Sequence, residues 1–69
     1  MYNVGETVRL ERNYLVKRLK KKPGSAYGRA VGRVVSLTSP YGDQWIEVKW
    51  SGKLLTHRFS NVHQLERVK

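Results

Sequence analysis

The chain of 69 residues contains no cysteine and only two histidines. The missing thiol excludes a disulfide framework, a thiol nucleophile and a cysteine-ligated zinc or iron–sulfur site, so we expect neither metal nor cofactor. No apolar run approaches the roughly 20 residues that span a bilayer, and the first residues lack the basic-then-apolar layout of a signal peptide. We therefore expect a cytoplasmic protein, nucleoid- or complex-associated, or a nuclear one in a eukaryote.

The length predicts one domain over residues 1–69 with a small core, because a chain of this size buries only about 60 % of its unfolded surface. Hydrophobic residues make up 39 % and charged residues 28 % of the chain, which is the balance of a globular protein rather than a disordered one.

Carboxylates are scarce, with five Asp and Glu against fourteen Lys and Arg, a net charge of +9. Nine of these cations and a single glutamate fall between residues 9 and 33. Such a concentration costs self-repulsion in the folded state and implies an anionic partner, unless the charge serves solubility alone. We expect that partner to be nucleic acid, with an acidic protein as the alternative and a membrane surface excluded.

Alternating polar and apolar residues predict five short strands, at about 6–11, 30–37, 44–50, 54–59 and 65–68. Turn residues fill 38–43, and Ser51-Gly52 predicts a tight hairpin turn. Gly32 indicates a bulge or a close backbone approach, and Ser60 is expected to cap a helical turn before the last strand. The inward positions predict this core: Val8, Leu10, Val34, Ile46, Val48, Trp50, Phe59, Leu65 and Val68.

Residues 12–28 are interpreted as a long basic loop, anchored by Tyr14, Leu15 and Val16 and unable to continue as a helix past Pro23. The order of elements predicts an all-β fold, a small five-stranded antiparallel barrel, because closure removes exposed strand edges. A two-layer α+β sheet is the competing fold if residues 12–22 form a helix.

The order of four stretches resembles an SH3-like small barrel of the KOW/Tudor type. The stretches are Val4-Gly5-Glu6-Thr7-Val8-Arg9-Leu10, Gly32-Arg33-Val34-Val35-Ser36-Leu37, Val48-Lys49-Trp50-Ser51-Gly52 and Val62-His63-Gln64-Leu65-Glu66-Arg67-Val68. The KOW likeness implies nucleic-acid binding, whereas the Tudor likeness implies an aromatic cage for methylated side chains. Proteins with this fold have many different functions, so the function must be inferred from the residues of the site rather than from the fold.

Two further families are similar at the ends of the chain. Basic SH3-like subunits that dock acidic ferredoxin have a similar size, opening and ending, but not the lysine-rich loop. Type II dihydrofolate reductases end in a strand like Leu65-Glu66-Arg67-Val68. Their active-site signature, Val-Gln-Ile-Tyr, is replaced here by His57-Arg58-Phe59-Ser60, so that activity is excluded.

The strongest candidate site is Lys17-Arg18-Leu19-Lys20-Lys21-Lys22, in which five of six residues are cations. Such a run can follow a phosphate backbone and release condensed counterions, although a solvated charge run or a nuclear-import address is the plainer interpretation. Arg9, Arg12, Arg29 and Arg33 flank the loop and are expected on its side of the barrel.

Aromatic side chains near these cations are candidates for stacking on bases. We expect this of Tyr27 and Trp45, whereas Tyr41 is more typical of a turn and Trp45 has packing under the basic loop as an equal alternative. Lys53 and Arg58 are interpreted as bystanders. His57 and His63 have no nucleophile or carboxylate at a suggestive spacing, so we expect no catalytic residues and no enzyme.

Overall fold

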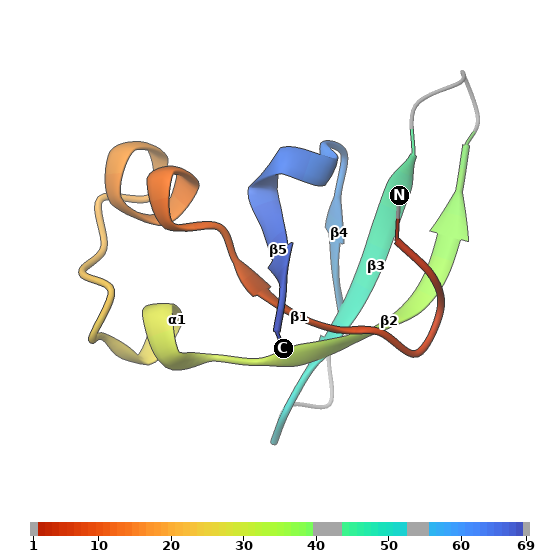
Figure 1. Ribbon diagram of the computed structural model, residues 1–69, viewed down its shortest axis with the longest axis horizontal. Helices are drawn as coiled ribbons and strands as arrows, with labels where there is room; N and C mark the ends of the chain where they lie inside the picture. The colour runs from red at the N-terminus through yellow and green to blue at the C-terminus, as the bar shows by residue number, and fades with distance from the viewer. Residues whose placement is uncertain (1, 40–43, 53–55, 69) are drawn as a thin grey trace.

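The computed structural model describes residues 2–39, 44–52 and 56–68, and within them five strands form one antiparallel sheet. The expected all-β class is therefore confirmed (Figure 1). The expectations for Tyr41, Lys53 and the first residues of the fourth strand lie outside the described residues. The strands are β1 (Thr7–Leu10), β2 (Gly32–Thr38), β3 (Trp45–Trp50), β4 (Thr56–Phe59) and β5 (Leu65–Arg67).

The sheet has the order β4-β3-β2-β1-β5, so the first strand lies inside it and pairs with both β2 and β5. The outer strands β4 and β5 are joined by a short 3₁₀ turn, η2 (Val62–Gln64). In the described part of the chain the ladders do not connect β4 to β5, so the hydrogen-bonded sheet is open.

The core lies on the inward face of this sheet. Seven predicted members are buried, and Val8, Ile46 and Val48 are completely inaccessible. Phe59 is half-buried and meets Trp50 edge to face, with ring centroids 6.1 Å apart. Val68 was wrongly assigned to the core, because β5 ends at Arg67 and leaves it half-exposed at the margin. Tyr2 and Leu15 take places in the core that the alternation of the strands did not predict.

Gly32, the first residue of β2, lies against the side chains of Val48 and Trp50 on β3. A Cβ added there would lie 2.5 Å from Val48 Cγ1 and 2.8 Å from Trp50 Cε3, so the expected close approach is confirmed. The bulge lies further along β2, where Val34 faces Val48 and Ser36 faces Glu47. The extra residue between them is Val35.

The expectation of one long loop over residues 12–28 is wrong, because two short helical elements interrupt it. They are η1, a π-helical turn (Tyr14–Arg18), and α1 (Ala26–Arg29), which lie together at one end of the sheet (Figure 1). The apolar spacing that anchors the segment also brings Leu15 into the core, at 2 % exposure. Neither element is long enough to form the second layer of an α+β fold.

Two local assignments need correction. Asn61 rather than Ser60 caps η2: its side chain accepts from the His63 N–H at 2.8 Å, while the Gln64 side chain accepts from the Asn61 N–H. Ser51 and Gly52 lie in a turn, as expected, but the pairing of Lys49 with Thr56 does not fit a two-residue loop.

Candidate nucleic-acid interface

The basic segment, residues 17–22, begins inside η1 and continues through a defined turn. The Leu19 N–H donates to the Tyr14 carbonyl and the Lys21 N–H to the Leu15 carbonyl, each at 3.1 Å. Lys20 between them has φ = 59°, the left-handed conformation that ends many helices. Because Leu15 is buried in the core, the turn that follows it, and the lysines on that turn, are attached to the body of the protein.

The chain after the basic segment is compact around Ser25. The Ser25 hydroxyl donates to the Lys22 carbonyl at 2.6 Å and accepts from the Gly28 N–H at 3.3 Å, which caps α1. Gly28 packs on Pro23 so closely that a Cβ would lie 2.0 Å from the Pro23 carbonyl oxygen. These contacts hold Arg29, at the end of α1, in a fixed relation to the lysines.

Tyr27 is the predicted stacking residue that lies next to the basic segment. Its side chain is 54 % exposed, and the Lys21 ammonium lies 4.9 Å from the centroid of its ring. This cation–π contact joins α1 to the basic segment and places an exposed aromatic ring beside a cation.

Trp45 lies in a different part of the molecule. It begins β3 opposite Thr38, the last residue of β2, whereas α1 precedes the first residue of β2. Seven residues of β2 span about 20 Å, so this half-buried indole does not share a surface with Tyr27. The structure therefore does not bring the two predicted stacking residues together.

Two carboxylates of the described residues, Glu6 and Glu66, form ion pairs away from the basic segment. Glu6 pairs with Arg67, whose guanidinium also lies 4.7 Å from the centroid of the Tyr2 ring. The hydrogen bond from Arg67 lowers the pKa of the Glu6 carboxyl. Glu66 pairs with Arg9 at 3.3 Å, so Arg9 is partly neutralised by the protein itself.

Glu11 has a capping role at the start of the helical turns. Its carboxylate accepts the N–H groups of Asn13 and Tyr14 at 3.0 and 2.9 Å, and these bonds lower its pKa. None of the ion pairs among residues 2–39, 44–52 and 56–68 involves a cation of the basic segment, Arg12, Arg29 or Arg33. Lys17 interacts electrostatically with Glu11 and contributes to its lowered pKa, whereas the other cations of this set form no ion pair within the described residues.

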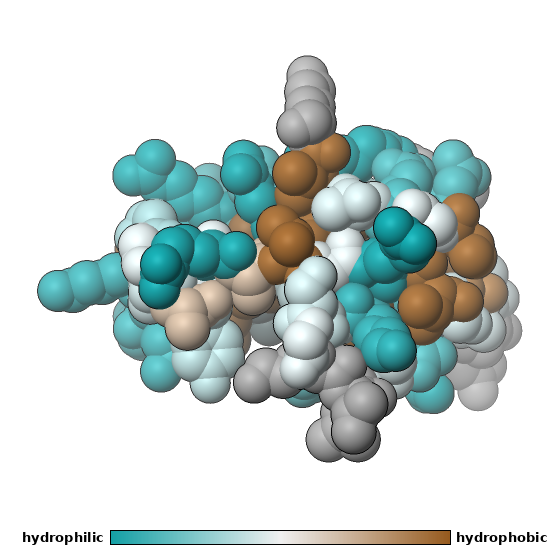
Figure 2. Space-filling view, turned by 90° about the horizontal axis from the view of Figure 1, so that it is seen from below, coloured by the Kyte–Doolittle hydropathy of each residue, from teal (hydrophilic) through white to brown (hydrophobic). Residues whose placement is uncertain are grey.

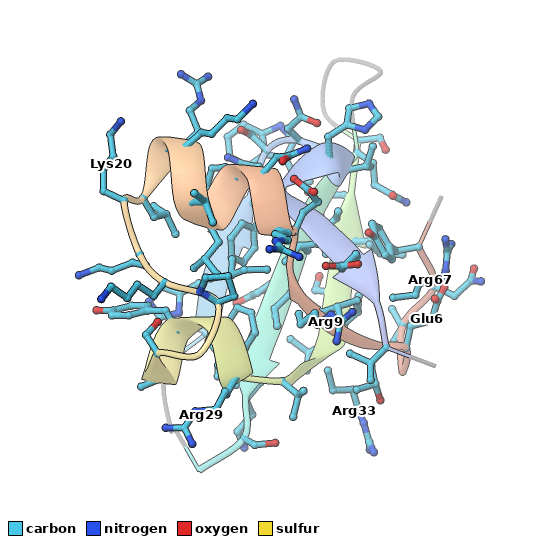
Figure 3. All side chains as sticks on the ribbon, turned by 60° about the vertical axis from the view of Figure 1, so that its left-hand side comes forward. Glu6, Arg9, Lys20, Arg29, Arg33 and Arg67 are labelled. Carbon is cyan, nitrogen blue, oxygen red and sulfur yellow. The ribbon has the colours of Figure 1, made fainter. Side chains whose placement is uncertain are left out.

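The predicted arginines point to different sides of the molecule. In Figure 3 the Arg29 and Arg33 side chains extend to the lower side and Lys20 to the upper side, with Arg9 between them. Arg12 is exposed where the chain enters η1. The cations thus lie on several sides of the molecule rather than in a single flat patch.

Lys49 is a functional candidate that the sequence reasoning missed. It lies on the outward face of β3, directly opposite Arg33 on β2. The alternation of β3 placed Lys49 outward, but only the register between the two strands shows which residue it faces.

Other kinds of site find little support in the structure. An open hollow of about 750 Å³ beside η2 is lined by Tyr2, Glu11, His63 and Glu66, but both of its carboxylates are already engaged. Across the described ranges, His, Asp and Glu form no group of three that would hold a metal ion. No helix among the described residues has the length and apolar character of a transmembrane span.

Comparison of the chain with protein-family models, with curated proteins and with solved structures gives no match. A function must therefore be argued from the charges and contacts described above.

Proposed function

We propose that this protein is a non-enzymatic nucleic-acid-binding module that holds the phosphate backbone through the basic segment and the neighbouring arginines. The observation that carries the proposal is the uncompensated charge: in the described parts of the chain no carboxylate forms an ion pair with Arg12, Arg18, Lys20, Lys21, Lys22, Arg29 or Arg33. Keeping such charges together costs stability, which an external polyanion offsets.

The shape of the basic segment favours contact with phosphates over reading of bases. Lysine ammonium groups are point charges on flexible stems, which neutralise phosphates without recognising a base edge. Tyr27 adds one exposed ring for stacking, worth about 1–3 kcal/mol if a base covers it. We therefore expect affinity that is mainly electrostatic, with modest sequence preference.

We also infer that the open sheet belongs to the SH3-like small-barrel class, as a KOW-type member. The strand order, with β1 between β2 and β5, and the η2 turn before the last strand support this assignment. The Tudor alternative needs several aromatic rings in one pocket, and the separation of Tyr27 from Trp45 disfavours it.

The test is a binding titration with labelled single- and double-stranded DNA and RNA at several salt concentrations. One variant replaces Lys20, Lys21 and Lys22 by Gln, and its matched control replaces the same three residues by Arg. Each phosphate contact contributes about one unit to the slope of log affinity against log salt. The Gln variant should show a slope shallower by about three units on every sequence, and the Arg control should keep the original slope.

Unchanged binding by the Gln variant would show that the basic segment is not the nucleic-acid-binding site. Poly-glutamate of matched charge serves as the acidic-protein control. If the protein binds poly-glutamate but no nucleic acid, the alternative of a docking subunit for an acidic partner replaces the proposal.

A further inference from the structure

The outward face of the sheet carries a like-charge pair that the fold does not compensate. Arg33 on β2 lies directly opposite Lys49 on β3, and both side chains are exposed. Like charges directly opposite on neighbouring strands destabilise a sheet, because their side chains are held about 5 Å apart at Cβ. A sequence that keeps such a pair retains an unfavourable interaction, which is expected mainly at functional positions.

The residues on either side of this pair do not relieve it. Across the strands the row reads Thr7, Arg33, Lys49 and Thr56, so hydroxyls rather than carboxylates face the two cations. Glu47 shares the outward face, but its carboxylate accepts the Thr56 hydroxyl at 2.5 Å and lies outside ion-pairing distance of both cations.

The pair is continuous with the proposed interface. Arg29 ends α1 four residues before Arg33, and both side chains point to the lower side of the molecule (Figure 3). Figure 2 shows that side, on which hydrophobic side chains lie among hydrophilic ones. Val31, just before β2, and Val35 within it are 36 % and 40 % exposed, and their side chains offer no hydrogen bond to a base edge.

We propose that Arg33 and Lys49 form a second phosphate-binding surface, so that the nucleic acid continues from the basic segment over Arg29 and across the outward face of β2 and β3. This proposal rests on the proposed function. A nucleic-acid backbone fits because its charges are regularly spaced, so that one molecule can occupy both surfaces at once. The expected contacts are to phosphates, flanked by the Thr7 hydroxyl.

The test uses the double variant R33Q/K49Q, with the charge-preserving exchange R33K/K49R as its control. Removal of two phosphate contacts should make the salt slope shallower by about two units and weaken binding on the order of 50-fold at 0.1 M salt. The control should bind within about threefold of the original protein. Combined with the Gln variant of the basic segment, the losses in slope should add to about five units.

A thermal denaturation measurement separates a ligand-binding role from a structural one. Because the like-charge pair is removed, the melting temperature of R33Q/K49Q should rise by about 2–5 °C while its binding falls. Loss of both stability and binding would assign the pair a structural role and overturn the proposal.

Failure of this proposal is distinguishable from failure of the proposed function. If the Gln variant of the basic segment loses affinity but R33Q/K49Q binds normally, the second surface is wrong and Arg33 leaves the interface, while nucleic-acid binding through the basic segment stands. If R33Q/K49Q loses affinity for poly-glutamate as strongly as for nucleic acid, the face is a docking surface for acidic protein. If the unmodified protein binds no nucleic acid, both proposals fail.

Discussion

Gly28 lies against Pro23 with no room for a side chain between them. A Cβ at Gly28 would meet the Pro23 carbonyl oxygen at 2.0 Å and its carbonyl carbon at 2.5 Å. Both partners are backbone atoms, so a clash cannot be relieved by rotating a side chain. This contact fixes the position of α1 relative to Pro23, the residue that directly follows the basic segment.

Gly28→Ala should therefore lower the free energy of unfolding by about 2–3 kcal/mol, as overpacking does in other tightly packed sites. The matched control is Gly24→Ala, because a Cβ at Gly24 meets nothing within 4 Å. That variant should be neutral or stabilising by up to about 1 kcal/mol. Urea denaturation followed by circular dichroism measures both, and equal stabilities would contradict the packing.

Leu15→Ala should destabilise the protein by about 3 kcal/mol, because it removes a side chain that is 2 % exposed and leaves a cavity. It should also release the basic segment, so that trypsin cuts after the lysines faster than in the original protein. Val16→Ala is the control on the same helical turn, since Val16 is 41 % exposed and should change stability by less than about 0.5 kcal/mol. Equal trypsin cleavage of both variants would show that Leu15 does not anchor the segment.

Lys20→Gly should stabilise the fold by about 0.5 kcal/mol. The left-handed conformation at φ = 59° costs a residue with a Cβ about 1–2 kcal/mol, and the greater freedom of glycine in the unfolded chain offsets part of the gain. Lys22→Gly has no such strain to relieve and should lose stability. Because both variants remove one cation, a difference between their melting temperatures isolates the backbone effect.

Stability should fall on acidification through the loss of two carboxylate interactions. The hydrogen bond from Arg67 lowers the pKa of Glu6, and the N–H groups of Asn13 and Tyr14 lower that of Glu11. Below the ordinary value of about 4.3 the unfolded chain binds more protons than the folded one, so this stability is present above that pH and disappears as pH falls through the lowered values.

The melting temperature measured from pH 7 to pH 3 should therefore drop most steeply below about pH 4.3. In the double variant Glu6→Gln/Glu11→Gln the stability at pH 7 should be lower and the drop shallower. If the two proteins lose stability in parallel, these carboxylates do not account for the acid sensitivity.

Local patterns predicted the strands and most of the core. The alternation of Ile46, Val48 and Trp50 identified the buried face of β3 because burial on one face repeats every second residue. The same reasoning missed Leu15, whose burial depends on how the turn at Tyr14–Arg18 folds back onto the sheet. Isolated propensity does not determine such tertiary docking.

The candidate site was predictable in its charge but not in its arrangement. The lysines of the basic segment are evident in the sequence, whereas the Arg9–Glu66 ion pair and the Arg33–Lys49 opposition depend on strand register. Register is set by how distant strands meet, and a shift of one residue would move each side chain to the other face. Trp45 likewise lies far from Tyr27 because the strand between them extends over seven residues.

The extra residue at Val35 has a consequence for how this chain tolerates changes in length. It exchanges odd and even positions within β2, which lets Leu37 face the core opposite Ile46 although Val34 lies three positions earlier. Without Val35 the pairing would be regular, with Leu37 still opposite Ile46, so deletion of this one residue should leave the inward side chains on the core face. Insertion of one more residue between Ser36 and Leu37 would instead turn Leu37 toward solvent.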